Sequence, residues 1–529
     1  MFYPEKRDGY SRIGKIKTEN LVLNTPTLLE FNGKPELQVD FGKAPYALRF
    51  ISETLYERLK PIEKEISVLT GLNVLSPRQI LQAFEEKRST KPLYAVAAAT
   101  TSNVALLFYL GADIVDNILA IAKAYSGLYF VGDIEMNVFK LKKFPCSCQY
   151  CKSRSLNDLS RDEIYEIAAG HNTEMLKLEV EKCRHLIERE ELRNYVEAKV
   201  KLHPEMTAVL RVADSYGDKK YFSRFKKSRC HFSAMESANR FEVSYFLNRA
   251  LECYKPVTDT VLLLPCTARK PYLTSRTHRH IRSRVRINVN EIIISSPLVV
   301  PREFELTYPA INYDTPVTGH WSEDEIAFVA SWLRRFIEKG GFRKVVAHVE
   351  GGYRKVVERA LENLQIEVVY TVEDGILGEG SMERLREEVA GLKGFDLYER
   401  IFDHMLRYQF DIEYRNCRYS GKYPEIEMLK GKERVARVDV RYGMLDIYEK
   451  IARILLDKGI YTVKIADFDF TNTIFAAGVL EADENIRPND VVVFTSNSIL
   501  GVGIAAMSGG EMVESEKGIA VRVKRKYPV

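Results

Sequence analysis

The sequence predicts a multidomain α/β protein, and three observations lead to that prediction. The chain has 529 residues, which is too many for one hydrophobic core, so we expect about three or four domains. Apolar strand-like stretches such as 94–99 alternate with helical ones such as 101–110 and 114–123, as they do in α/β domains. Residues 461–529 instead hold short β runs separated by turns, which predicts a small β-barrel at the carboxyl end.

The composition argues against a polybasic or membrane-spanning chain. Lysine and arginine total 78 against 73 acidic residues, so any contact with nucleic acid must come from local basic patches. The most apolar run, 104–122, is interrupted by Asp113 and Asp116, so we expect no membrane span. The first residues lack the apolar core of a signal peptide, and four of the eight cysteines have no disulfide-like spacing. We therefore expect a cytoplasmic protein.

Three cysteines and one histidine form a candidate metal site. Cys146, Cys148 and Cys151 lie in one tight loop, and His171 follows downstream. Three thiolates and an imidazole make the tetrahedral donor set that Zn²⁺ prefers, and four protein ligands leave no open position for a substrate. We expect a structural zinc ion; the alternative is a chance cluster of cysteines.

The segment from about residue 255 to 385 predicts a doubly wound α/β domain, in which helices cover both faces of a parallel sheet. The expected strands are 261–264, 291–294, 344–349 and 367–370, and the expected helices are 323–339 and 353–364. Ligands of such domains bind at the carboxyl ends of the strands. Farther along, 444–457 reads as a helix beside a strand-rich stretch, which predicts a small α+β domain.

A reactive cysteine is expected at the end of the first strand of the doubly wound domain. Cys266 directly follows the apolar run 261–264, and the neighbouring Arg269 and Lys270 are cations that favour a thiolate. His278 can act as an acid or base near neutral pH. The alternative is a buried structural cysteine beside a solvated basic loop.

Around the metal cysteines the sequence resembles the archaeal tRNA-guanine transglycosylases. The matching stretches are 111–117, Phe144 to Cys148 with Cys151, and 168–172. The resemblance implies a zinc site and a nucleophilic aspartate at Asp116. A complete (β/α)8 barrel needs about 250 residues, yet only 145 residues precede Cys146, and the second aspartate segment of that family is missing. We therefore expect a trimmed barrel in which Asp116 recognises a base or is structural.

The segment after residue 264 resembles the archaeosine synthases. Their motif of Pro-Cys, three residues, Lys-Pro-Tyr, two residues, Ser, two residues and His is filled at every fixed position. These positions are Pro265, Cys266, Lys270, Pro271, Tyr272, Ser275 and His278. The resemblance implies a transferase that modifies tRNA carrying 7-cyano-7-deazaguanine at position 15. A Cys266 thiolate can add to the electrophilic nitrile carbon to form a thioimidate, which an amine then displaces.

The resemblance and the chemistry together suggest roles for further residues. We expect His278 or Lys270 to protonate the imide nitrogen, and Asp314 or Glu303 to orient the base or accept a proton from the amine. The expected substrate-binding residues are Tyr272, Ser275, Glu303 and Asp116.

The amine donor is left open between lysine and glutamine-derived nitrogen. Archaeosine synthases have been described with either donor, and a separate, radical enzyme cleaves the lysine adduct. The sequence has no recognisable glutaminase segment, which favours free lysine. Two alternatives remain: a tRNA-guanine(15) transglycosylase acting through Asp116, and a non-catalytic subunit that binds tRNA.

The last segment resembles a PUA domain, an RNA-binding β-barrel. Arg522, Lys524 and Lys526 alternate at strand spacing and form a basic face for phosphates, or else a solvated edge strand. A second basic cluster, which includes Arg279 and Arg282, follows the Cys266 motif. The expected domains are a transglycosylase-like domain over 1–254, a catalytic domain over 255–392, a linking domain over 393–460 and a PUA domain over 461–529. The resemblance to the archaeal transglycosylases also implies a homodimer.

Overall fold

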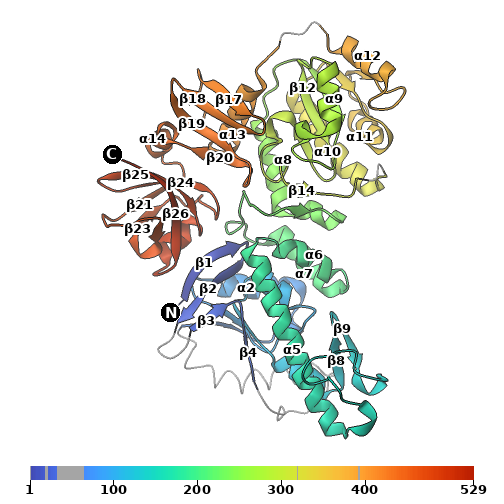
Figure 1. The fold of residues 1–529 in the computed structure, drawn as a ribbon, viewed down its shortest axis with the longest axis vertical. Helices are drawn as coiled ribbons and strands as arrows, with labels where there is room; N and C mark the ends of the chain where they lie inside the picture. Colours follow the sequence, from blue (N-terminus) through green and yellow to red (C-terminus); the bar gives the residue numbers. More distant parts are fainter. Residues whose placement is uncertain (1, 18–21, 32–64, 318–319, 391–393, 529) are drawn as a thin grey trace. The chain divides into compact units, whose positions relative to one another are not determined.

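The computed structural model describes residues 2–17, 22–31, 65–317, 320–390 and 394–528. The chain divides into two compact units, drawn in Figure 1. The first holds Met1–Ser223, Val463–Pro488 and Ile504–Val523, and the second holds Arg224–Thr462, Asn489–Gly503 and Lys524–Val529. The expected boundary between residues 392 and 393 touches residues outside the described ranges. Among the described helices, none is long and apolar enough to cross a membrane.

The first unit is built on a parallel sheet of four short strands. Their order is β4 (Thr27–Leu29), β7 (Ile114–Asp116), β6 (Leu93–Ala95) and β5 (Ser67–Leu69). Each neighbouring pair is parallel. A complete (β/α)8 barrel has eight such strands, so the four found in the described residues confirm the prediction of a trimmed barrel.

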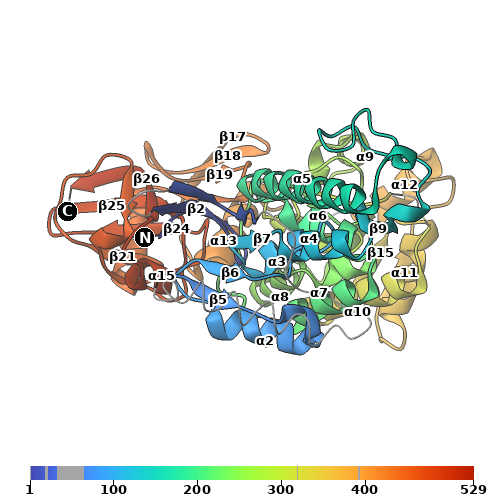
Figure 2. The same cartoon turned by 90° about the horizontal axis from the view of Figure 1, so that it is seen from below.

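Helices pack along both edges of this sheet. α2 (Pro77–Lys87) packs against β5, and the long helix α5 (Arg161–Glu188) packs against β4 (Figure 2). α5 begins where Ser160 and Glu163 form a capping box, which satisfies two backbone N–H groups at the helix start. Further helices in the described part of residues 1–223 are α3 (Val104–Leu110), α4 (Ile118–Tyr125), α6 (Leu192–Val200) and α7 (Pro204–Tyr216).

The most apolar part of the sequence lies in the interior of the first unit. Every residue of α3 is buried, as are all three residues of β7. The prediction of one helical stretch over 114–123 is therefore wrong at its start, because Ile114–Asp116 pair with β4 and β6 before α4 begins. Short apolar runs do not distinguish a buried strand from a buried helix.

Two antiparallel elements also lie in the first unit. One is a three-stranded sheet of β1 (Phe2–Asp8), β2 (Ser11–Lys17) and β3 (Val22–Thr25). The other is the hairpin of β8 (Leu128–Val131) and β9 (Ile134–Asn137), which stands just before the metal cysteines.

The second unit contains the predicted doubly wound domain. Its five-stranded sheet has the order β13 (Val299–Pro301), β12 (Asn290–Ile294), β11 (Thr260–Pro265), β15 (Lys344–Ala347) and β16 (Glu367–Tyr370). Strands β12, β11, β15 and β16 are parallel to one another, and β13 pairs antiparallel with β12 at the edge of the sheet.

The apolar runs that predict these strands form the domain core. Leu262 and Leu264 of β11 share one cluster with Ile281 of α9 (Arg276–Arg284) and Leu385 of α12 (Glu379–Glu388). α10 (Glu323–Gly340) and α11 (Gly351–Leu361) pack together, and α10 also contacts α8 (Phe241–Cys253). The short strands β10 (Cys230–His231) and β14 (Tyr313–Asp314) pair beside them.

A small α+β domain follows the doubly wound one, as predicted. α13 (Leu397–Phe410) precedes the antiparallel sheet β17 (Arg418–Lys422), β18 (Glu425–Lys430), β19 (Glu433–Asp439) and β20 (Met444–Ile447). α14 (Glu449–Lys458) comes next, so the predicted helix over 444–457 is wrong in its first turn, which forms β20. The cause is again a buried apolar run, because all of Met444–Ile447 is buried.

The end of the chain is β-rich. Six strands form one sheet in the order β22 (Thr473–Phe475), β26 (Ile519–Pro528), β25 (Ile499–Ala505), β24 (Val491–Thr495), β21 (Thr462–Ile465) and β23 (Val479–Ala482). The short helix α15 (Gly509–Glu514) stands between β25 and β26. This arrangement agrees with the β-barrel expected from the turn-separated runs.

Candidate functional site

Cys266 lies where the topology of the doubly wound sheet changes direction. From β11 the chain passes through α9 to β12 on one side, whereas β15 pairs with β11 on the other side. The carboxyl ends of β11 and β15 therefore flank a topological switch point, the usual ligand position in such sheets. Cys266 follows β11 directly, donates its backbone N–H to Ile294 O over 3.0 Å and is 7% exposed.

The side chain that contacts the Cys266 thiol belongs to Tyr353, which follows β15, the strand next to β11. Tyr353 Oη lies 3.2 Å from Cys266 Sγ. Tyr353 is in the first turn of α11, and its ring meets Trp321 edge-on at 5.1 Å. Burial raises the pKa of the Tyr353 phenol above its usual value. Sequence reasoning missed Tyr353, although the glycine pair before it, after an apolar strand, was a usable signal.

Lys270 places a positive charge near this thiol. Its Nζ lies 4.1 Å from the centre of the Tyr313 ring and has no hydrogen-bond partner in the described structure. Burial lowers the pKa of Lys270, while the nearby Cys266 and Asp314 act in the opposite direction. Tyr313 in turn hydrogen bonds to Tyr272 and donates to Ser295 Oγ over 2.5 Å. The spacing of the sequence motif thus corresponds to one aromatic cluster around a lysine.

His278 is buried behind the site and has both ring nitrogens occupied. Its Nε2 donates to Pro265 O over 3.0 Å, and its Nδ1 accepts from Arg302 Nη2 over 2.8 Å. Burial, followed by the charge of Arg302, lowers the pKa of His278 to about 3. A neutral imidazole held in this way fixes the backbone beside Cys266, and this geometry does not favour the expected acid–base role.

The pKa of His278 predicts a pH dependence of stability. Below about pH 6.5 the unfolded chain takes up a proton at this position and the folded chain does not, so the free energy of unfolding falls as the pH is lowered towards 3. Between about pH 7.5 and about pH 5 the expected loss from this group is about 2 kcal/mol. Urea titrations at both pH values measure the loss. His278→Gln, which keeps a donor and an acceptor, should reduce it; an equal loss in this variant contradicts the assignment.

The other expected site residues take separate positions. The Asp314 side chain is 56% exposed and pairs with Arg229 at 3.5 Å. Glu303 is buried and pairs with Arg400 at 3.1 Å, so the structure does not bring it to the Cys266 thiol. Ser275 caps α9 by accepting the backbone N–H of His278 over 3.2 Å.

Asp116 is fully buried at the end of β7. Its Oδ2 accepts hydrogen bonds from Tyr94 Oη at 2.6 Å and Ala97 N at 2.9 Å, and its Oδ1 accepts from Ile118 N at 3.0 Å. Burial raises the pKa of Asp116 to about 6. A carboxylate engaged in this way joins β6, β7 and α4, which fits a structural role.

The predicted basic residues differ in what they contact. Arg279 is exposed on α9, whereas Arg282 forms an ion pair with Glu291. Arg522 donates to Glu5 O over 2.7 Å, and Lys524 lies 3.3 Å from Asp446. Lys526 is exposed on β26. Of the two predicted arginines, Arg279 and Arg282, the exposed Arg279 is therefore the one available to a phosphate.

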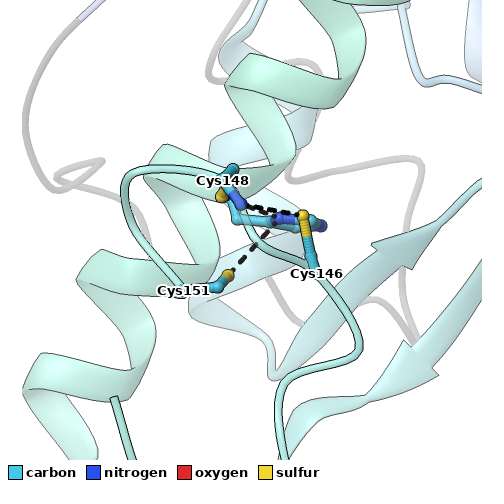
Figure 3. Close-up of side chains that lie close together, drawn as sticks. Cys146, Cys148 and Cys151 are labelled. Atoms are coloured by element: carbon cyan, nitrogen blue, oxygen red, sulfur yellow. Dashed lines mark hydrogen bonds between the residues drawn. The ribbon is translucent and has the colours of Figure 1, made fainter. Parts of the chain in front are cut away.

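The four predicted metal ligands converge in the first unit. Their donor atoms, from Cys146, Cys148, Cys151 and His171, all lie within 4.8 Å of one another. Figure 3 shows the three cysteine side chains close together beside the helix. His171 Nδ1 lies 3.5 Å from Cys148 Sγ and 3.6 Å from Cys151 Sγ. This Cys3His cluster can hold a metal ion.

Neighbouring groups orient these ligands. His171 Nε2 donates to Phe130 O over 2.8 Å, which leaves Nδ1 as the nitrogen that can bind a metal. The Tyr129 ring stacks on His171 with the ring centres 3.8 Å apart. Tyr150, between the second and third cysteines, packs on Gly170, where an added Cβ would come within 2.3 Å of the ring. The glycine before His171 therefore allows the cysteine loop to lie against α5.

Four family models match successive parts of the chain. A queuine tRNA-ribosyltransferase model matches residues 54–205, and a domain of unknown function, DUF5591, matches 243–389. A pre-PUA domain matches 395–456, and a PUA domain matches 455–527. A crystallised protein of unknown function is 65% identical, with a TM-score of 0.50, and covers 54% of this chain and 99% of its own.

Similar proteins match most of the length. Archaeosine synthase subunit alpha of Methanosarcina acetivorans is 36% identical over 87% of this chain and 80% of its own. Archaeosine synthase of Haloferax volcanii is 32% identical, covering 84% and 78%. A tRNA-guanine(15) transglycosylase of Methanothermobacter thermautotrophicus is 24% identical, covering 84% and 68%. These matches confirm the resemblance carried by the Cys266 motif: the chain belongs to the archaeosine synthase family.

Proposed function

We propose that this protein adds a free amine to the nitrile of 7-cyano-7-deazaguanine at position 15 of tRNA, with Cys266 as the nucleophile. The observation that carries the proposal is the position of Cys266 at the switch point of the sheet, in contact with Tyr353 and near the Lys270 cation. A thiol, a hydroxyl and a positive charge are the groups that addition to a nitrile needs.

The reaction balances in two steps without an oxidant or reductant. In the first, the Cys266 S–H bond breaks, Sγ bonds to the nitrile carbon, and the nitrile nitrogen gains a proton to give a thioimidate. In the second, the amine nitrogen bonds to the same carbon and one of its N–H bonds breaks, the C–S bond breaks, and Sγ gains that proton, leaving an amidine. Covalent catalysis of this kind divides one difficult step into two easier ones.

Free lysine is the donor that we propose. The proposal rests on the sequence, which has no segment that resembles a glutaminase. The radical enzyme that would act on a lysine adduct, and a homodimer, are proposals that rest on the resemblance alone.

Mass spectrometry of nucleosides tests the function directly. tRNA bearing 7-cyano-7-deazaguanine is incubated with the protein and lysine, glutamine or ammonia in separate reactions. A mass gain equal to one lysine supports the proposal, and a gain with another donor corrects the amine. No gain with any donor, together with exchange of labelled base into unmodified tRNA, overturns it in favour of transglycosylation at Asp116.

We propose that the Cys3His cluster holds a structural zinc ion. Four protein donors, two of them half-buried thiols, leave no position for a reacting group, and closed sites of this composition contribute to folding. The ion would hold the cysteine loop on α5 and take no part in the chemistry at Cys266.

Removal of the metal is expected to destabilise the protein. Cys151→Ser should lose the zinc and lower the melting temperature by at least several degrees, because a closed metal site contributes binding free energy to folding. Metal analysis and calorimetry measure both effects. Cys183→Ser, a buried cysteine of α5 outside the cluster, is the matched control and should retain the metal. Wild-type protein that purifies and refolds equally well without zinc contradicts this proposal.

The PUA domain and the basic helix α9 are proposed to bind tRNA through phosphates. Arg279→Ala should weaken binding for every tRNA sequence and reduce the slope of log affinity against log salt by about 1, because one phosphate contact is lost. Binding titrations at several salt concentrations measure the slope. Arg334→Ala on α10, another surface arginine, should leave the slope unchanged. Affinity that does not respond to salt in the wild type contradicts phosphate recognition.

A further inference from the structure

We propose that Tyr353 is the catalytic acid–base group that carries the proton between Cys266 Sγ and the nitrile nitrogen. This inference rests on the proposed function, because it assigns a residue for the nitrile reaction. The sequence led us to expect a histidine or lysine in this role. The proposal assigns it instead to a tyrosine 87 positions after Cys266 in the chain.

The proposal begins with the contact between the two side chains. Tyr353 Oη is 3.2 Å from Cys266 Sγ, and among the described residues no other side chain is hydrogen bonded to this thiol. A phenol both donates and accepts, so one hydroxyl can accept the thiol proton while it donates its own. The nitrile nitrogen is one bond beyond the carbon that Sγ attacks, so a group beside the sulfur is also near the nitrogen.

The other expected proton carriers are not in hydrogen-bond contact with Sγ. Both nitrogens of His278 have partners, which are Pro265 O and Arg302 Nη2. The Lys270 ammonium lies over the Tyr313 ring, where it can supply positive charge to an anionic sulfur. Asp314 is exposed and pairs with Arg229. The Tyr353 hydroxyl is therefore the expected donor that directly contacts Sγ.

The fold holds Tyr353 in this position from the opposite side of the switch point. The turn after β15 contains Gly351 at φ +55°, a conformation that L side chains rarely adopt, and α11 begins there. The Trp321 ring meets the Tyr353 ring edge-on at 66°. Cys266 from β11 and Tyr353 from the β15 side thus face each other across the place where ligands of this fold bind.

The protonation state suits the role. Burial raises the pKa of Tyr353, so the phenol keeps its proton at neutral pH and is ready to donate when the imide nitrogen develops negative charge. In the second step the phenol can accept the proton that the amine loses while it donates its own to the departing sulfur. The group ends each cycle as it began, so the proton count stays balanced.

Tyr353→Phe tests the proposal in the full-length protein with cyano-bearing tRNA and lysine. The expected result is a loss in the rate of adduct formation on the order of 10² to 10⁴, the range for general acid–base groups, with tRNA affinity unchanged. Tyr370→Phe is the matched control, because that tyrosine is on β16 of the same sheet and its ring packs on Arg354 at 4.4 Å. A full rate in Tyr353→Phe overturns the proposal.

A second measurement separates catalysis from packing. A fluorinated tyrosine at position 353 has the same shape but a more acidic phenol. Across a series of fluorinated tyrosines, the restored rate should change with the acidity of the phenol; restored activity that does not vary with phenol acidity overturns the acid–base role. If the wild type itself adds none of the donors, the proposed function fails, which is a different result from a wild-type rate in the variant.

Discussion

Cys266→Ala is expected to abolish addition to the nitrile while leaving tRNA binding intact. Loss of the attacking group lowers turnover by a factor on the order of 10⁶ in a hydrolase whose catalytic residues have been dissected. Cys266 lies at the end of β11 and the proposed RNA contacts lie on other elements, so affinity should not change. Single-turnover assays by nucleoside mass spectrometry, with binding titrations on the same preparations, measure both quantities.

Two further variants make this prediction specific. Cys253→Ala removes another buried cysteine of the second unit, on α8, and should retain the rate. Cys266→Ser keeps the shape but replaces the thiol with a weaker nucleophile. A full rate in the serine variant would contradict the covalent step and indicate direct attack by the amine. Retained activity in the alanine variant would remove Cys266 from the mechanism.

The second large effect is expected at Arg302, on stability. Its guanidinium is 2% exposed and contacts Glu291 Oε2 at 2.7 Å and Glu305 Oε2 at 2.6 Å, besides His278. Removal of one partner from a buried ion-pair network leaves charges without compensation and costs about 3–5 kcal/mol. Arg302→Met should lower the free energy of unfolding by that amount in urea titrations.

A compensated variant checks the cause of this loss. Combining Arg302→Met with Glu291→Gln and Glu305→Gln removes the buried negative charges and should recover part of the stability. A single variant within about 1 kcal/mol of wild type would contradict the network. An unchanged loss in the combined variant would assign the effect to packing.

Local patterns in the sequence predicted the parts of the site that depend on adjacent residues. The apolar run before Cys266 predicted a buried parallel strand, and the alternation of strands and helices placed the thiol at its carboxyl end. Likewise, the spacing of Cys146, Cys148 and Cys151 predicted a cluster that the structure closes with His171. In both cases the chemistry follows from what a few consecutive residues can do.

Contacts between distant segments decided the parts that the sequence did not predict. Tyr353 reaches Cys266 only because β15 pairs beside β11, and a strand's own pattern does not name its neighbour. Histidine is a residue type that often acts as an acid or base, but Arg302 donates a hydrogen bond to Nδ1 of His278. Arg282, expected in the second basic cluster, is similarly ion-paired with Glu291 on β12. Charge in a sequence does not show which partners folding will provide.

The contact between Tyr150 and Gly170 has a consequence for metal uptake. The Tyr150 ring of the cysteine loop packs directly on the backbone of Gly170 in α5, and this contact does not require a metal ion. Ligands that are preorganised in this way lose less conformational entropy on capture, so more of the coordination energy remains as affinity. A glycine rather than an alanine at position 170 thus lets the loop order before the metal binds, and this should increase the affinity for the metal.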